Sequence, residues 1–68
     1  ILIEQPDGRI KISFRSRGAV DCNQLAARFG GGGHKAAAGT IVDGPFEPAR
    51  ERIAAAVDEA WRASRPTA

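Results

Sequence analysis

The sequence has few residues that could form a disulfide or bind a metal ion, because Cys22 is its single cysteine and His34 its single histidine. A lone cysteine excludes an internal disulfide and a cysteine-rich zinc site. No apolar run is long enough to span a bilayer and no basic-then-apolar leader is present, so we expect no membrane contact and a cytoplasmic location. With 68 residues and 43% hydrophobic side chains, the chain is predicted to form one globular domain, residues 1–68, near the size limit for a single stable core.

The positive charge is unevenly distributed. Residues 9–35 contain six of the ten cationic side chains and only one of the eight acidic ones. This stretch surrounds four consecutive glycines, residues 30–33. Clustered cations beside a flexible backbone suit a phosphate-bearing partner, and a solvated basic surface is the alternative.

Two strands are predicted at the start of the chain, over residues 1–5 and 9–15, with a Pro-Asp-Gly turn between them. Apolar and polar side chains alternate in the second strand, so one face is predicted to be core and the other cationic. The core face comprises Ile10, Ile12 and Phe14, and the other face Arg9, Lys11, Ser13, Arg15 and Arg17.

Two helices are predicted, with a short buried strand over residues 36–42 between them. The first helix, within residues 19–30, has Asp21 as its N-cap and Gly30 as the residue that ends it. The second lies within residues 43–64 and is followed by four residues that should fray. Its core side is predicted to comprise Phe46, Ala49, Ile53, Val57, Ala60 and Trp61. The order of elements predicts a small α+β domain with two helices packed against a single sheet.

The remaining glycines, Gly31 to Gly33, have two interpretations. The first is a flexible linker, but such linkers join domains, and both flanks of this run belong to one small core. Glycines also let backbone N–H groups approach an anion and form a concave nest. The order of residues excludes a Walker A loop and a Rossmann fingerprint. We therefore favour a phosphate-binding loop, with His34 as a further donor to the phosphate.

The stretch GGGHKAAAG, residues 31–39, preceded by a capped helix and by SFRSRG, residues 13–18, resembles the DHHA1 domain of DHH-family phosphoesterases. That family includes nanoRNase/pAp-phosphatase enzymes, RecJ exonucleases and cyclic-dinucleotide phosphodiesterases, and the resemblance to the first group covers nearly the whole chain. It implies a C-terminal substrate-binding domain, cut from a larger α/β enzyme and lacking its upstream strand or strands. It also implies a covalently linked N-terminal DHH domain that holds two manganese ions.

The resemblance assigns the loop facing the substrate cleft to Gly31, Gly32, Gly33 and His34, and a strand-end pair that contacts substrate to Arg15 and Ser16. Charge alone adds Arg17 and Lys35. The metal-binding Asp-His-His motif is absent, so no catalytic residue, metal ligand or cofactor is assigned to this chain. Alanyl-tRNA synthetases carry a more distant version of the domain without this glycine-histidine run.

The sequence thus predicts a domain that grips the phosphate and nucleotide of a short RNA or small nucleotide for a manganese-dependent phosphoesterase. Formation of a homo-oligomer is compatible with this interpretation. Two alternatives stay open, namely a stand-alone nucleic-acid-binding module and a structural dimerisation domain. The first would need aromatic stacking platforms, and the second leaves the glycine-histidine loop unexplained.

Overall fold

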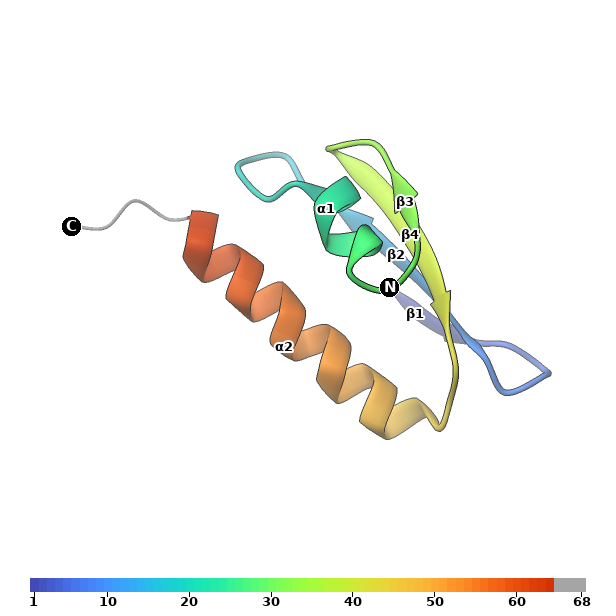
Figure 1. Ribbon diagram of the computed structural model, residues 1–68. Coiled ribbons are helices and arrows are strands. Elements are labelled where there is room, and N and C mark those ends of the chain that lie inside the picture. Colours follow the sequence, from blue (N-terminus) through green and yellow to red (C-terminus); the bar gives the residue numbers. More distant parts are fainter. Residues whose placement is uncertain (65–68) are drawn as a thin grey trace.

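The computed structural model describes residues 1–64, which form a four-stranded sheet and two helices (Figure 1). The strands are paired in the order β1-β2-β4-β3, and every neighbouring pair is antiparallel. This confirms the predicted α+β fold. The chain order is β1 (Leu2–Glu4), β2 (Ile10–Arg15), α1 (Cys22–Ala27), β3 (Gly32–Gly33), β4 (Ala37–Val42) and α2 (Phe46–Ser64).

The alternating sequence of β2 provides the centre of the core. Ile10, Ile12 and Phe14 are buried, whereas Lys11 and Arg15 between and beyond them are exposed. Since the buried side chains of β2 share one face and cluster with both helices, α1 and α2 lie on the same side of the sheet (Figure 1). The helix side chains in this cluster are Cys22, Leu25, Ala26, Ala49, Ile53 and Ala56.

Two local signals in the sequence are confirmed. The Asp21 carboxylate accepts a hydrogen bond from the backbone N–H of Gln24 at 3.1 Å, so it caps α1 as predicted. The turn between β1 and β2 contains Gly8 with φ of 86°. There the N–H of Gly8 donates to the carbonyl of Gln5 at 2.9 Å.

The end of α1 is also as predicted. The N–H of Gly30 bonds to the carbonyl of Ala27 at 3.2 Å, and the N–H of Gly31 bonds to that of Ala26 at 2.9 Å. These two bonds form a Schellman motif, and its left-handed residue is Gly30 with φ of 81°. A glycine is favoured here because it has no Cβ to oppose that conformation.

The buried side of α2 differs from the prediction. Ala49, Ile53 and Ala56 are buried, but Val57 and Trp61 are 39% and 54% exposed, so placing these two in the core was wrong. The sheet and the short α1 cover only a narrow stripe of α2. Val57 and Trp61 lie beside that stripe and line a shallow apolar groove.

Strand β4 is half-buried rather than buried as predicted. Thr40 faces the core opposite Ile12, whereas Ile41 lies opposite Lys11 and is 51% exposed. The reason is that both helices cover the same face of the sheet. Neither helix of the described residues 1–64 has the length and apolar character needed to cross a membrane. The predicted fraying of residues 65–68 lies outside the described part of the chain.

Candidate functional site

The predicted site residues meet around the hairpin turn that joins β3 to β4. His34 and Ala37 close this turn, since the N–H of His34 donates to the carbonyl of Ala37 at 2.8 Å and the reverse bond measures 3.2 Å. The turn is also attached to two other elements. The N–H of Cys22, at the start of α1, bonds to the carbonyl of Lys35 at 2.8 Å, and the N–H of Ser16 bonds to that of Ala36 at 3.0 Å. These bonds place the end of β2 beside the turn.

A hollow of about 520 Å³ opens at this junction. It is lined by Arg15, Ser16, Arg17, Ala36 and Ala37, so it brings together three of the eight predicted site residues from one segment. The other five occupy the adjoining strand and turn without lining the hollow. All of those five except the half-buried Gly31 are exposed.

The cations at this junction are not neutralised by neighbouring acids. The four ion pairs within residues 1–64 use other arginines, so none involves Arg15, Arg17 or Lys35. The hydroxyl oxygen of Ser16 accepts the N–H of Gly18 at 3.2 Å, which leaves its O–H available to donate. The junction therefore presents positive charge and hydrogen-bond donors to solvent, a combination that suits a phosphate.

The glycine N–H groups do not form the predicted anion nest. The N–H of Gly31 is bonded within the Schellman motif, and that of Gly33 donates to Asn23 Oδ1 at 3.1 Å. Because hydrogen-bonded and non-bonded pairs alternate along an antiparallel ladder, the closed turn at His34 makes Gly32 and Gly39 the next bonded pair. The donors predicted for an anion are thus used within the domain.

The run of glycines has a packing reason instead. A Cβ on Gly31 would overlap the backbone of Gly39 and Thr40, and one on Gly33 would lie 2.6 Å from the Cα of Ala38. Gly33 also has φ of 153°, which L side chains rarely adopt. Among the described residues, a Cβ on Gly32 would come within 4 Å of Asn23 Oδ1 alone, at 3.5 Å. Gly31 and Gly33 allow β3 to approach β4, and Gly32 leaves an open surface.

Asn23 is the residue that sequence reasoning missed. Its bond to Gly33 links positions ten residues apart, and an asparagine in the first turn of a helix gives no indication of such a contact. The strand at Gly32 and Gly33 could not be predicted either, because a strand is recognised by alternating polar and apolar side chains and glycines have none. Only the tertiary arrangement identifies Asn23 as part of this loop.

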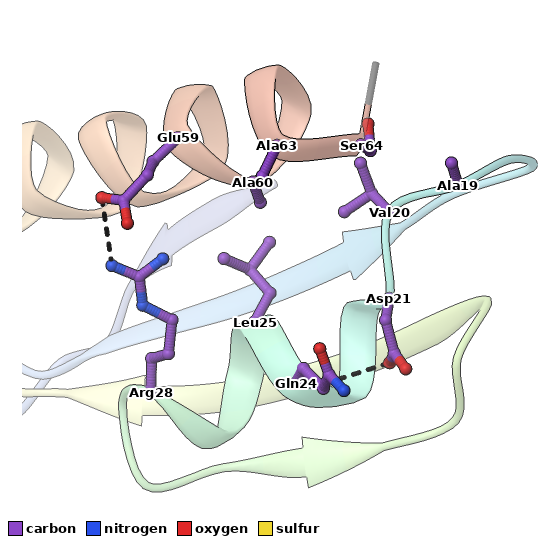
Figure 2. A pocket seen from close by; sticks show the side chains of 10 residues that line it. All are labelled: Ala19, Val20, Asp21, Gln24, Leu25, Arg28, Glu59, Ala60, Ala63 and Ser64. Carbon is purple, nitrogen blue, oxygen red and sulfur yellow. Dashed lines mark hydrogen bonds and ion pairs between the residues drawn. The ribbon is translucent and has the colours of Figure 1, made fainter. Parts of the chain in front are cut away.

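A second concave surface lies between α1 and the last turns of α2 (Figure 2). It contains none of the predicted site residues. Its cation, Arg28, faces Glu59 across the groove at 3.4 Å, so its charge is already paired. This groove therefore lacks the uncompensated positive charge found at the β3–β4 turn. The residues that line it are Ala19, Val20, Asp21, Gln24, Leu25, Arg28, Glu59, Ala60, Ala63 and Ser64.

The described residues 1–64 contain no group of three or more His, Cys, Asp or Glu side chains that could hold a metal ion. The thiol of Cys22 is buried, and this burial raises its pKa above the ordinary value. A raised pKa disfavours the thiolate, which is the form that binds metals. Cys22 accordingly contributes to the core.

Comparison with known proteins identifies the family of this chain. Residues 1–63 match the family model described as the DHHA1 domain. A similar curated protein is the bifunctional oligoribonuclease and PAP phosphatase NrnA of Thermus thermophilus, which is 38% identical over 60 residues. The match covers 87% of this chain and 18% of that protein, so the chain spans about a fifth of its relative. The matched family model, the GGGHKAAAG block and the α+β fold together show that this chain belongs to the DHHA1 domain family.

Proposed function

We propose that this domain binds the phosphate and adjoining nucleotide of a short oligoribonucleotide or small nucleotide, as part of a two-domain DHH-family phosphoesterase. The observation that carries the proposal is the set of uncompensated cations Arg15, Arg17 and Lys35 around the β3–β4 turn. The relative with oligoribonuclease and PAP phosphatase in its name supports a substrate of this class.

Each side chain has a definite task in this proposal. The planar guanidinium of Arg15 can bond two phosphate oxygens at once, and the O–H of Ser16 can donate to another. Arg17 and Lys35 add positive charge, which favours the encounter with an anion. His34 donates from the turn, and Gly32 gives the ligand close access to a strand without side chains. Glycine thus acts here through open space rather than through N–H donors.

The chemical step belongs to the linked DHH domain in this proposal. Two manganese ions there would polarise the phosphate and activate water. The residues of the present chain bind and orient the substrate, which lowers the entropic part of the barrier. The purified 68-residue chain should accordingly release no mononucleotide from a short RNA in the presence of manganese. Release by this chain would show that the division of labour is wrong.

A stand-alone module for single-stranded nucleic acid is less well supported. Such modules stack bases on exposed aromatic rings beside a basic groove. In this chain Phe14 is buried, and Phe29 and Phe46 pack against the core. The exposed Trp61 lines a groove formed with Leu2 and α2, which shares no lining residue with the hollow at Arg15. The basic junction thus offers no aromatic platform among the described residues.

The test is a titration of the ¹⁵N-labelled chain with a 5′-phosphorylated dinucleotide, followed by amide chemical shifts. We expect the largest shifts in residues 15–17 and 31–36, and much smaller ones with the same dinucleotide lacking the 5′-phosphate. Arg52→Ala is the matched control for loss of a cation at the site, such as Arg15, because Arg52 is an exposed cation on α2 without an ion pair among the described residues. It should bind as the unaltered chain does. Shifts confined to the α1–α2 groove of Figure 2 would place the ligand elsewhere and contradict the proposal.

A further inference from the structure

The outward-facing edge of β3 is held by a side chain. β3 is the last strand of the sheet, so only one of its edges pairs with β4. At the other edge, Asn23 Oδ1 accepts the N–H of Gly33 at 3.1 Å. It occupies the place where the carbonyl of a further strand would stand. Asn23 belongs to the first turn of α1, so this bond ties the edge strand to a helix.

Two successive residues of α1 hold the residues on either side of His34. Asn23 holds Gly33 through its side chain, and Cys22 holds Lys35 through its backbone N–H at 2.8 Å. His34 itself is exposed and stands between these two attachments. The position of His34 is therefore set by α1 as well as by the pairing of β4 with β2. Cys22 is buried in the core, which keeps that helix in place.

From this geometry we infer that Asn23 is a positioning residue for the phosphate site, acting through Gly33 on the orientation of His34. The inference rests on the proposed function, because it assigns Asn23 to the same site. A hydrogen bond from an exposed N–H could equally be made by water, so the fold itself needs this contact little. The φ of 153° at Gly33 is one of many that a glycine can adopt, so the bond to Asn23 has a purpose in holding the residue in this one conformation.

The chemistry of asparagine suits this place. An aspartate would accept the same N–H, but it would add a negative charge next to a site for an anion. The amide supplies a neutral acceptor instead. Asn23→Ala and Asn23→Asp therefore separate two contributions, the hydrogen bond and the neutrality of its acceptor.

The experiment measures two properties of the Asn23→Ala, Asn23→Asp and Gln24→Ala chains. Amide hydrogen exchange of Gly33 reports the tether without any ligand. Calorimetric titration with the 5′-phosphorylated dinucleotide, at low and at high salt, reports binding. Gln24→Ala is the control, because Gln24 is an exposed neighbour in α1 whose described hydrogen bonds, from its N–H to Asp21 and to its carbonyl from Arg28, all use the backbone.

We expect Asn23→Ala to lose Gly33 protection and to weaken binding about two- to tenfold at both salt concentrations, which corresponds to one neutral hydrogen bond. Asn23→Asp should keep the protection, weaken binding at low salt and approach the unaltered chain at high salt, because salt screens the added charge. Gln24→Ala should change neither property.

Two results would overturn the inference. One is full Gly33 protection in Asn23→Ala, which would show that there is no tether. The other is lost protection with unchanged affinity, which would show that the tether does not serve the site. Failure of the proposed function gives a different pattern, because the unaltered chain would then not bind the dinucleotide at all. In that case Asn23 would retain only a structural role, and the positioning inference would also be rejected.

Discussion

The two ends of the sheet are held by different forces. Toward the β1–β2 turn, Ile10 and Ile12 of β2 pack against Ile53 of α2, and all three are at most 3% exposed. At the tip of the β3–β4 hairpin, His34 and Lys35 are exposed, and single hydrogen bonds from Asn23 and Cys22 attach the residues there to α1. A packed core commits its side chains to stability, whereas a hydrogen-bonded loop leaves its side chains free. Stability and binding should therefore respond to different substitutions.

The largest loss of stability is expected from truncation at the packed end. Ile12→Ala removes a side chain that is 1% exposed, and should lower the free energy of unfolding by about 2–5 kcal/mol. Chemical denaturation monitored by circular dichroism measures this loss. Lys11→Ala, at the exposed neighbour on the other face, is the control and should stay within about 0.5 kcal/mol of the unaltered chain. Equal losses in the two variants would show that β2 does not alternate between core and solvent.

The glycines of the loop should divide into two classes when each is replaced by alanine. Gly31→Ala forces β3 away from β4 and should cost about 1–3 kcal/mol of stability. A Cβ at Gly32 would lie 3.5 Å from Asn23 Oδ1, an ordinary contact distance, so Gly32→Ala should leave stability within about 0.5 kcal/mol while weakening dinucleotide binding. The measurement is a thermal melt of each variant beside its titration. If Gly32→Ala binds normally, the open strand surface is not part of the site.

Removal of the helix cap should have a smaller effect. Asp21→Ala loses the acceptor for the N–H of Gln24 and should lower the free energy of unfolding by about 0.5–2 kcal/mol. Asp21→Ser retains a capping oxygen and should recover most of that stability. The midpoint of urea denaturation distinguishes the variants. An unchanged midpoint in Asp21→Ala would mean that the start of α1 does not depend on this cap.

The smallest effect is expected at the β1–β2 turn, far from the loop. Hydrogen bonds from the backbone and side chain of Arg9 lower the pKa of Asp7 below its usual 3.8. A lowered pKa in the folded state means that this carboxylate stabilises the fold above about pH 4. That contribution is lost as the pH falls through the lowered pKa. An NMR titration of the Asp7 carboxyl carbon should give a midpoint below that of the unfolded chain, and a midpoint at or above it would contradict the contact.

The features that the sequence predicted correctly are local. The alternation of β2, the cap at Asp21 and the left-handed Gly30 each depend on neighbours within a few residues. The apolar stripe of α2 was only partly predicted, because the sequence does not show how much of a helix a small sheet can cover. Val57 and Trp61 fit the helical period but lie beyond the covered stripe.

The site was harder to predict, because its contacts depend on tertiary structure rather than on neighbouring residues. Charge and the glycine-histidine block indicated two segments that the fold brings beside one turn, whereas the conformation of the glycines depends on a strand pairing that glycines do not reveal. Closure of the turn at His34 and the contact from Asn23 give the N–H groups internal partners. The predicted anion nest of glycine N–H groups is therefore absent from the described residues. The side chains predicted for the site nevertheless lie around the β3–β4 turn.

The central claim is that the β3–β4 turn binds phosphate without holding the fold together. Calorimetric titration of Arg15→Ala and His34→Ala with the 5′-phosphorylated dinucleotide, each beside a thermal melt, tests it most directly. A hydrogen bond to a charged group contributes about 1.5–3 kcal/mol, so each variant should bind about ten- to a hundredfold more weakly. Both should melt at the temperature of the unaltered chain, because both side chains are exposed. Unaltered affinity in both variants would contradict the claim and leave the glycine-rich hairpin with a structural role alone.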